Sequence, residues 1–489
     1  MSIYDFWFSN ENLWFNSSIS DDQIIINKFY YLLNLNTKTE SKKHLIECII
    51  IYDQLVRHFF RGKKLPKIYS DIAINCSKKI INSNIINDCL PQELCFVLLP
   101  YRHLKTIHHI EFCLDIVSIY IKYDLKNKYY QRFYKASLKS LSEIKSKSQL
   151  MKPFNYCKTF DTNILDSNCT FKLYEPITVN KLNEKLVNGF RNLPKQTFTL
   201  SISGGVDSIV CSYILYCLKI PFVGLIIDYS NRESSIEEIN MVSYWFNLLK
   251  ISLYVRTIDE IKRNKSDRQF YEKITKNIRF DCYKILNNPV ILGHNRDDKI
   301  ENIFANINKC QNYDNLNGMK DISRIDGVEI YRCLLDINKS DIIKFAQKMK
   351  LPYVYDSTPD WSFRGKTRDK IIPAIKSVDK NILNGLEMLS ENLKDVMKLI
   401  DFDKIISNIR FTLDEINVKK LSFPRQNTKL FIFWQKLFKF VNEKYGFQIF
   451  SKKSIINFIS QLSQKETKVL LCKNCKGIIK NGVIILTEV

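Results

Sequence analysis

Glycine and proline are scarce in this chain, with 13 Gly and 12 Pro among 489 residues. Hydrophobic residues make up 45% and aromatic residues 12%, so a fibrous or globally disordered protein is excluded. No uncharged apolar run reaches the roughly twenty residues of a membrane-spanning helix. Residues 1–8 carry no basic region followed by an apolar run, so we expect no secretory signal. A globular protein without membrane association follows, and roughly 100 to 200 residues per domain gives two to four domains.

Acidic residues are outnumbered, with 51 Asp and Glu against 74 Lys and Arg and a formal charge of +23. Such an excess favours a polyanionic partner, nucleic acid first, because Lys and Arg neutralise phosphates. Ile, Asn and Lys are enriched together in this chain, as in proteins from AT-rich genomes, so coding bias is the alternative explanation for the excess of lysine. Several of the 14 cysteines lie in hydrophobic stretches, as free buried cysteines do, which predicts a reducing, cytoplasmic location.

The hydrophobic pattern divides the chain into four segments. In 1–150 apolar residues recur every three or four positions, which predicts an all-helical domain. Residues 151–180 lack periodicity and are interpreted as a linker. Residues 181–385 alternate strand and helix patterns, typical of a doubly wound parallel sheet with its ligand crevice at the carboxyl ends of the strands. Residues 386–489 are predicted to be helical to about Leu462 and then to form short strands, a small α+β accessory domain.

The elements expected in the third segment are bounded by turn residues. The predicted strands are Phe198–Ile202, Phe222–Ile227, Leu253–Ile258 and Val290–Leu292, and the predicted helices Asp207–Leu218 and Ile236–Leu249.

The most specific string, Ser201–Ser208, reads Ser-Ile-Ser-Gly-Gly-Val-Asp-Ser and lies between a predicted strand and a predicted helix. Its two glycines let the backbone approach an anion, and the helix amino terminus offers free amides. Its serine hydroxyls can donate to phosphate oxygens, and Asp207 can hold Mg²⁺ or cap the helix. A Gly-Gly turn capped by Asp and Ser would explain the same residues without a ligand.

This string resembles the signature of the PP-loop, or N-type ATP pyrophosphatase, superfamily and lacks the Gly-Lys-Ser/Thr ending of a Walker A motif. Enzymes of this kind cleave ATP between the α and β phosphates and leave an adenylated substrate. The resemblance implies ATP and Mg²⁺ as cofactors. The residues that it assigns to ATP are Ser203, Gly204, Gly205, Val206, Asp207, Ser208 and His294.

Further strings narrow the resemblance to tRNA(Ile)-lysidine synthetases over residues 185 to 385. Ile291–Asn302 looks like their His-His-x-x-Asp-Asp-Gln-x-Glu-Thr segment, although Gly293 stands in place of the first His. Asn302 replaces the Thr, and Gly365 replaces an Asn, so the chain is similar to a divergent subfamily. Other matching strings lie near Arg232, Glu272 and Arg279, and at Leu316–Met319, Tyr355–Pro359 and Phe363–Pro373.

The resemblance implies that the wobble cytidine of tRNA(Ile) is adenylated and that free lysine is then ligated to it, forming lysidine and releasing AMP and pyrophosphate. On this interpretation Asp207, Asp297, Asp298 and Arg368 are catalytic, and Asp207 and Asp298 hold Mg²⁺. The residues assigned to tRNA or substrate are Arg232, Glu272, Arg279, Glu301 and Arg364. In lysidine synthetases a small C-terminal domain helps to bind tRNA, and the resemblance implies the same role for residues 386–489. A solvated helix face is the alternative for the basic run that begins at Arg364.

Two other functions remain open: a tRNA thiolase of the same fold and a non-catalytic scaffold that binds nucleotide or tRNA. Thiolases of this type resemble lysidine synthetases but hold an iron–sulfur cluster or a persulfide on several cysteines. Cys282, Cys310 and Cys333 form no Cys-x-x-Cys pair, which argues against a thiolase. Cys472 and Cys475 form a single Cys-x-x-Cys pair, whereas a structural zinc site needs four ligands. We therefore interpret the two cysteines as flanking a turn between short strands.

Strings in residues 1–150 are similar to an uncharacterised helical family with a tetratricopeptide-like fold. They include Trp14-Phe15, Asp53–Gly62 and Leu99–His103. An interaction module for a protein partner is the prediction for this segment. Asp53, Arg57 and His103 could form a polar site, but buried ion pairs that brace helices explain them equally well.

Overall fold

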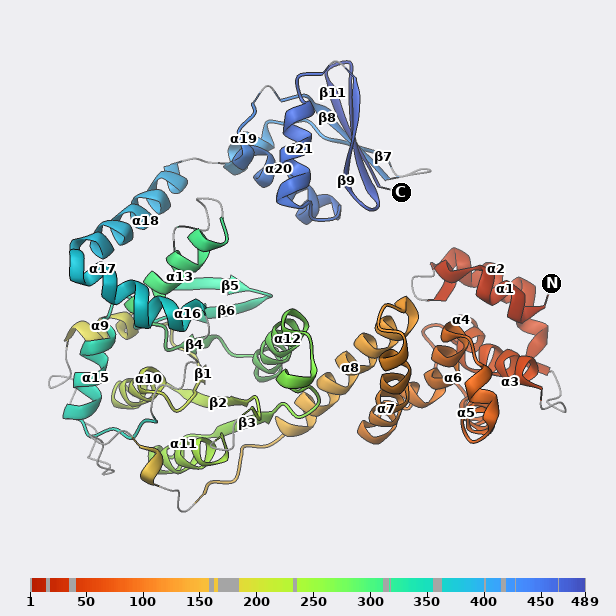
Figure 1. Cartoon of the computed structure of the whole chain (residues 1–489), viewed down its shortest axis with the longest axis horizontal. Coiled ribbons are helices and arrows are strands. Elements are labelled where there is room, and N and C mark those ends of the chain that lie inside the picture. The colour runs from red at the N-terminus through yellow and green to blue at the C-terminus, as the bar shows by residue number, and fades with distance from the viewer. Residues whose placement is uncertain are drawn as a thin grey trace. The chain divides into compact units, whose positions relative to one another are not determined.

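The computed structural model describes residues 2–14, 18–34, 41–157, 162–165, 184–231, 235–310, 316, 318–354, 363–399, 402–414, 419–426, 428–464 and 466–488. The chain forms two compact units, each built from two stretches of sequence (Figure 1). Unit 1 comprises Met1–Asn295 with Asp321–Asp356, and unit 2 comprises Arg296–Lys320 with Ser357–Val489.

Unit 1 begins with helices alone, as the spacing of apolar residues predicted. Polar side chains start several of them: Thr106 accepts a hydrogen bond from the N–H of His109, and Asn127 accepts from two amides of the next helix. Trp7, Trp14 and Phe96 pack edge to face in their common core. The helices are α1 (Ile3–Ser9), α2 (Ile19–Phe29), α3 (Lys42–Ile49), α4 (Val56–Phe59), α5 (Lys67–Ile81), α6 (Pro91–His103), α7 (Ile107–Tyr123) and α8 (Lys128–Gln149).

A six-stranded sheet follows in the order β3-β2-β1-β4-β6-β5. All neighbouring strands are parallel except β5 and β6, which form an antiparallel hairpin at one edge. The α/β fold with a mostly parallel sheet is therefore confirmed, and the edge hairpin of β5 and β6 is an addition that the sequence analysis did not predict. The strands are β1 (Phe198–Ser201), β2 (Phe222–Asp228), β3 (Leu253–Thr257), β4 (Val290–Leu292), β5 (Ile322–Ile325) and β6 (Val328–Tyr331).

Alternating strand residues bury both faces of this sheet. Leu200, Ile226 and Ile291 belong to one apolar core with α9, α10, α11 and α15, whereas Leu225 and Val290 belong to a second core with α12, α7 and α8. The amino-terminal helices thus help to cover the second face of the sheet. The sheet's own helices are α9 (Glu184–Arg191), α10 (Val206–Cys217), α11 (Ser235–Leu249), α12 (Arg268–Leu286) and α15 (Lys339–Lys348).

Buried charges join α8 to this second face. The fully buried Arg256 of β3 donates through Nε to Ser146 Oγ of α8 (3.0 Å) and forms an ion pair with Glu260, which is also fully buried. Lys145, the neighbour of Ser146, lies 3.0 Å from Asp259. Because an unpaired buried charge is costly, these pairs fix α8 against β3.

Unit 2 contains helices and an antiparallel five-stranded sheet in the order β7-β8-β11-β10-β9. Trp434, Phe438 and Phe458 pack together in its core. The helices are α13 (Arg296–Asn308), α16 (Phe363–Lys366), α17 (Ile372–Val378), α18 (Asn381–Leu399), α19 (Phe402–Ser407), α20 (Phe431–Tyr445) and α21 (Lys452–Gln461), and the strands β7 (Thr412–Asp414), β8 (Lys419–Pro424), β9 (Thr467–Cys472), β10 (Cys475–Lys480) and β11 (Val483–Glu488).

The prediction of uninterrupted helices up to Leu462 was wrong, because β7 and β8 lie inside that range. In β8, Leu421 and Phe423 point into the core while Lys420 is exposed, which is the period of a strand. The turn expected at the cysteine pair is present: β9 ends at Cys472 and β10 begins at Cys475. None of the described helices is long and apolar enough to cross a membrane.

Candidate functional site

The predicted phosphate loop connects β1 to α10 at the carboxyl end of the sheet (Figure 1). Gly204 has a φ of 81°, a conformation that residues with side chains rarely adopt. Ser208 Oγ accepts a hydrogen bond from the N–H of Ser203 (3.2 Å) and donates to the carbonyl oxygen of Gly205 (2.9 Å). Among the described residues, no side chain caps the amino terminus of α10. The loop is therefore closed on itself, and the first turn of α10 keeps its amides for an anion.

Asp207, in the first turn of α10, contacts one cation and one amide. Lys339 Nζ donates to its Oδ2 at 2.5 Å, and Asn295 Nδ2 donates to its Oδ1 at 3.0 Å. Lys339 is the first residue of α15, and Asn295 follows β4, so three separate segments meet at this carboxylate. A carboxylate and an ammonium group placed beside free helix amides suit a bound phosphate with its metal ion.

Gly293, the position where the chain departs from the family string, packs against the loop. A Cβ added at Gly293 would lie 3.1 Å from the backbone nitrogen of Ser208 and 3.2 Å from Cβ of Asp207. These distances are shorter than ordinary van der Waals contacts, so a larger residue would displace the loop. The glycine lets β4 approach the amino terminus of α10 closely.

His294 points to the edge hairpin. Nε of Arg332, which follows β6, donates to His294 Nδ1 at 3.1 Å, and Nη1 of Arg332 donates to Ser323 Oγ at 2.9 Å. Burial lowers the pKa of Arg332, but the guanidinium stays charged because its ordinary value is above 12. Since Nδ1 accepts a hydrogen bond, His294 carries its proton on Nε2 in this arrangement.

Two residues of α12 lie near the end of β1. Tyr283 Oη donates to Ser201 Oγ at 2.9 Å, and burial raises the pKa of Tyr283 to about 12, so the hydroxyl stays protonated. Arg279 Nε is buried and has no hydrogen-bond partner among the described residues. A buried donor without a partner is costly in a protein interior, which marks Arg279 as a residue available to an acceptor.

Glu272 and Arg232 were also assigned to tRNA or substrate, and the structure gives no comparable observation for either of them. Glu272 is exposed on α12 and pairs with Arg268 at 2.9 Å, one helical turn away. An ordinary surface ion pair accounts for that contact. Arg232 lies outside the described residues.

In unit 2 the acidic residues of α13 meet the basic run that follows it in sequence. Arg364 forms ion pairs with both Asp298 and Glu301, and Arg368 Nε donates to Glu301 at 2.9 Å. Asp298 and Glu301 are 9% and 3% exposed, so two guanidinium groups balance two buried carboxylates. Arg368 lies in a π-helical turn, Thr367–Ile371, a feature often found at functional sites. Asp297 is half-buried in the first turn of α13.

A second network holds α13 to α18. Arg296 Nε donates to Glu387 at 2.7 Å, and Lys299 Nζ lies 3.3 Å from Glu387 and 3.0 Å from Glu391. Burial alone would lower the pKa of Lys299, but the two glutamates raise it, so this ammonium group stays charged. Arg296 and Lys299 lie on the side of α13 away from Asp298 and Glu301, so the network fixes the rotation of the helix and with it the direction of the two carboxylates.

The described site residues therefore form two clusters. The loop cluster, in unit 1, comprises Ser203–Ser208, Gly293, Asn295 and Lys339. The acid–arginine cluster, in unit 2, comprises Asp298, Glu301, Arg364 and Arg368.

Sequence reasoning missed Asn295 and Lys339 of the loop cluster, and also Arg332, which donates to His294. One signal could have pointed to Lys339: it is the first residue of an amphipathic helix, where the helix dipole disfavours a cation. Arg332 and Asn295 carry no comparable local signal, because only the sheet brings them beside His294 and Asp207.

Two known families match separate stretches of this chain. A family described as a PP-loop domain matches residues 178–375, and a family described as a bacterial protein of unknown function (DUF924) matches residues 3–149. The PP-loop prediction is confirmed by the first match. The tetratricopeptide-like character of the amino-terminal helices stays a prediction.

Several curated proteins are similar to this chain. The tRNA(Ile)-lysidine synthase of Chlamydia muridarum is 28% identical over 215 residues, which cover 42% of this chain and 66% of that protein, slightly less than two thirds. The tRNA(Ile)-lysidine synthase of Chlamydia trachomatis serovar A is 26% identical over 322 residues, covering 62% of this chain and 97% of that protein. Among solved structures, the U34-tRNA thiolase NcsA from Methanococcus maripaludis shares 15% identity, covers 55% of this chain and 82% of that chain, and gives a TM-score of 0.34, too low to bear on function.

Proposed function

Because residues 178–375 are a PP-loop domain and the chain is related to tRNA(Ile)-lysidine synthases, we propose that it is an ATP-dependent tRNA-modifying ligase. The observation that carries the proposal is the loop cluster. Its backbone is closed on itself by the hydrogen bonds of Ser208, and Asp207 is held between Lys339 and Asn295. Amides at the amino terminus of a helix beside a fixed carboxylate suit the phosphates of ATP with their metal ion.

The first-turn amides of α10 and the hydroxyls of Ser203 and Ser208 would bind the phosphates of ATP. Both hydroxyls now bond within the loop, and a phosphate oxygen can replace those partners. Lys339 would exchange Asp207 for the phosphates, where its charge stabilises the departing pyrophosphate. Arg279, with its buried Nε, is our candidate for contact with substrate or tRNA.

The groups beside the phosphate loop suit Mg²⁺ as a ligand set. Among the described residues, no three His, Cys, Asp or Glu side chains are grouped closely enough to hold a metal. Mg²⁺ usually takes only one or two carboxylates and completes its shell with phosphate oxygens and water, so Asp207 beside the loop amides fits the ion. Asp298, now paired with Arg364, is the second candidate ligand. When bound, Mg²⁺ would neutralise charge on the phosphates as pyrophosphate leaves.

The finer proposal is lysidine synthesis on tRNA(Ile). The C2 carbonyl oxygen of the wobble cytidine, flipped out of the stack, attacks the α-phosphorus, and the bond to the β-phosphate oxygen breaks. The neutral ε-amine of lysine then attacks C2, and AMP leaves with the former carbonyl oxygen. The surplus proton of the amine passes to a carboxylate, for which Asp297 is the candidate. Glu301, Arg364 and Arg368 would position the substrate or the pyrophosphate.

Two other functions make different predictions about this chain. A thiolase needs reactive thiols, yet burial raises the pKa of Cys282 to about 11 and that of Cys333 to about 12, so both are protonated near neutral pH. A non-catalytic scaffold would bind nucleotide or tRNA without releasing pyrophosphate.

The test is transfer of radiolabelled lysine to a mixed tRNA pool with ATP and Mg²⁺, with pyrophosphate followed in parallel. Label in tRNA supports the full proposal. Pyrophosphate that depends on tRNA, without label, would retain the adenylation step and reject lysine as the acceptor. Neither signal would reject the enzyme in favour of the scaffold.

A matched pair of variants ties the activity to the loop cluster. Asp207→Asn should abolish pyrophosphate release, because it removes the charge that holds Lys339 and the ion. Asp341→Asn, on the partly exposed face of α15, should leave the rate unchanged. Equal rates for the two variants would reject the assigned site.

A further inference from the structure

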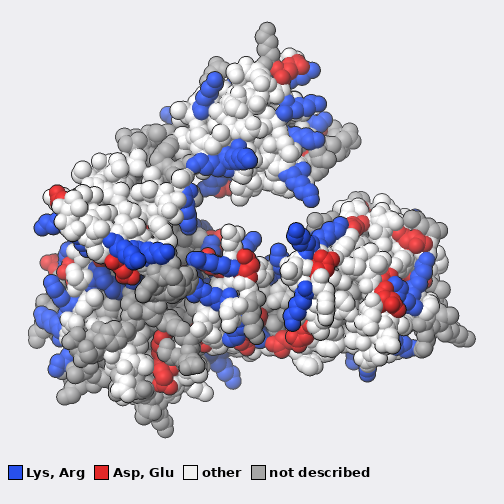
Figure 2. All heavy atoms as spheres, viewed as in Figure 1, with Lys and Arg blue, Asp and Glu red and all other residues white. Residues whose placement is uncertain are grey.

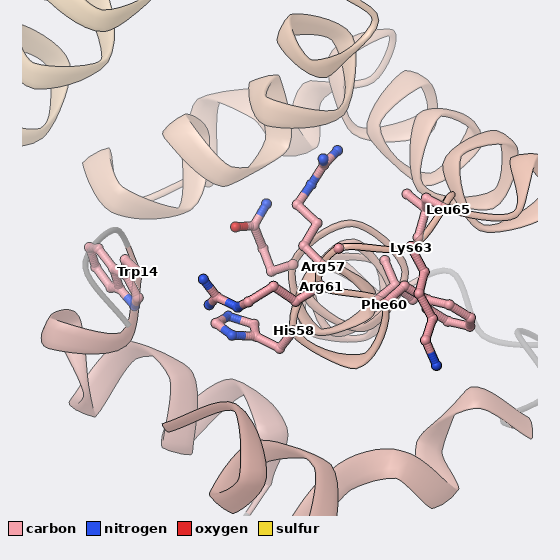
Figure 3. A pocket seen from close by; sticks show the side chains of 10 residues that line it. Trp14, Arg57, His58, Phe60, Arg61, Lys63 and Leu65 are labelled. Carbon is pink, nitrogen blue, oxygen red and sulfur yellow. The ribbon is translucent and has the colours of Figure 1, made fainter. Parts of the chain in front are cut away.

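A pocket of about 410 Å³ lies among the amino-terminal helices and uses none of the residues of the two clusters (Figure 3). Trp14 supplies one wall, Gln54 of the π-helical turn Ile50–Leu55 another, and α4 with the turn after it the rest. Figure 3 shows the side chains of His58 and Arg61 extending side by side towards Trp14. The volume is within the roughly 300 to 1,000 Å³ of small-ligand sites.

Every charged side chain among the described residues that line this pocket is basic. They are Arg57, Arg61 and Lys63, which lie with His58, and none of the described lining residues carries a carboxylate. Gln54 supplies an amide, so the polar lining consists mainly of hydrogen-bond donors. A ligand that satisfies such a lining is rich in acceptors and negatively charged.

Two carboxylates hold these cations in place. Asp22, 5% exposed, lies 2.7 Å from His58 Nδ1 and accepts a hydrogen bond from Arg61 (2.8 Å). Asp53, 2% exposed, accepts from Arg57 (2.9 Å). The side chains of Arg57 and Arg61 nevertheless remain 40% and 48% exposed. Each guanidinium therefore has one edge fixed by an ion pair, and a planar fork fixed in this way is suited to binding an oxyanion.

Bracing of helices explains only part of this arrangement. Asp53 also lies 2.9 Å from His103 of α6, and burial, which acts to raise its pKa, is outweighed by His103 and Arg57, so the carboxylate stays charged. Those contacts do connect helices. Lys63, however, lines the pocket without an acidic partner among the residues that the structure describes. Gln54 belongs to a π-helical turn, a feature often retained at functional sites.

We propose that this pocket binds a small organic phosphate, a phosphate monoester on a planar or apolar body. The exposed edges of Arg57 and Arg61 and the ammonium group of Lys63 offer more hydrogen-bond donors than one carboxylate can accept, which favours the several acceptor oxygens of a phosphate. Trp14, Phe60 and Leu65 supply apolar surface for the rest of the molecule. The site is separate from the proposed ligase chemistry and does not depend on it.

Hydrogen exchange measured by mass spectrometry on the full chain tests the proposal, with AMP as the probe and adenosine and inorganic phosphate as comparisons. AMP should slow exchange in residues 50–66 in a saturable way, and adenosine should not. AMP bound at the loop cluster would instead slow exchange near residues 202–210, so the two sites are distinguishable. Protection only at 202–210, or none up to millimolar AMP, would overturn the proposal. Equal protection of residues 50–66 by inorganic phosphate and by AMP would overturn the assignment to an organic phosphate.

Variants of neighbouring lysines give the matched control. Lys63→Gln should weaken AMP binding about 1.5- to fivefold, the range of a solvent-exposed charge contact, without disturbing the buried pairs. Lys64→Gln, an exposed neighbour outside the lining, should leave binding unchanged. Arg61→Gln should weaken binding by more than about tenfold if the fold is retained. If the two lysine variants weaken AMP binding equally, AMP responds only to the general positive charge of the surface, and the proposed site is rejected.

Discussion

Lys339 places a cation at the amino end of a helix, where the helix dipole disfavours one. Its partner is Asp207, 132 residues earlier in the chain, at 2.5 Å. Asp207 suits the first turn of its own helix, but Lys339 does not suit the start of α15, and a ligand explains the position of the lysine better than helix stability does. The arrangement suits a site where a phosphate takes the lysine and a metal ion takes the carboxylate.

Replacing Lys339 with Gln should therefore impair catalysis more than folding. We expect pyrophosphate release to fall by about 10²-fold, the usual cost of one preorganised donor at a developing charge. Initial rates with saturating ATP measure the effect. Lys344→Gln, on an exposed position of the same helix, is the control. A normal rate for Lys339→Gln would exclude the lysine from the phosphate site.

Gly293 allows a second residue-scale prediction. Gly293→Ala places a Cβ 3.1 Å from Ser208 N, so the loop must shift by a few tenths of an ångström. Overpacking of this kind costs about 1–3 kcal/mol, and we expect it to appear as weaker ATP binding. Equilibrium dialysis with ATP measures the affinity. Gly385→Ala, where a Cβ meets no atom within 4 Å, should have no effect on it. Unchanged ATP affinity in Gly293→Ala would contradict the close packing.

The sequence predicted those parts of the site whose residues lie close together along the chain. Ser203 to Ser208 form one local string, and their contacts lie within five residues of each other, so a motif was enough to find them. Lys339, Asn295 and Arg332 join the site only through the order of the strands. No local pattern specifies that order, which is why these residues were missed.

At the scale of elements, strands were predicted where they are buried on both faces. Val290–Leu292 is a continuous apolar run, and Phe198–Ser201 is buried up to Leu200; both strands were found within one residue. β5, β6, β7 and β8 were missed. β5 and β7 are largely exposed, β6 has the charged Glu329 within it, and in β8 Lys419 and Lys420 precede the inward Leu421. Edge hairpins and amphipathic strands carry weaker signals than buried ones.

The buried pair between Arg256 and Glu260 is an element-scale feature that can be tested. Arg256→Met leaves Glu260 as a buried charge without its partner and removes the bond to Ser146. Breaking such a pair costs about 3–5 kcal/mol, and we expect faster hydrogen exchange in α8 and β3. Arg268→Met, at an exposed pair on α12, should change neither segment. Unaltered exchange in α8 would mean that apolar packing alone holds it to the sheet.

At the scale of the whole molecule, α7 and α8 share an apolar core with the sheet and α12. The amino-terminal helices are therefore built into the unit that carries the phosphate loop. The four-segment division inferred from the sequence did not anticipate this, because a change in hydrophobic period marks where elements change and not which elements pack together.

The excess of positive charge is distributed over the surface, and Figure 2 shows Lys and Arg predominating on the visible face of residues 402–488. On the five-stranded sheet, Lys420 of β8 and Lys476 of β10 both pair in register with Thr487 of β11, and both are exposed. They form a short basic row across three strands. We propose that this row contacts the phosphate backbone of tRNA, as the accessory role of this segment suggests.

Counterion release sets the expected outcome. Each phosphate contact makes the slope of log K against log salt more negative by about 0.7 to 0.9, so Lys420→Gln with Lys476→Gln should make the slope shallower by about 1.4 to 1.8. Filter binding of tRNA between low and physiological salt measures it. Lys439→Gln, whose side chain on α20 is already near Glu443, is the matched control and should keep the original slope. If the double variant keeps that slope as well, the basic row makes no phosphate contact, and the charge of the chain acts on tRNA through other surfaces.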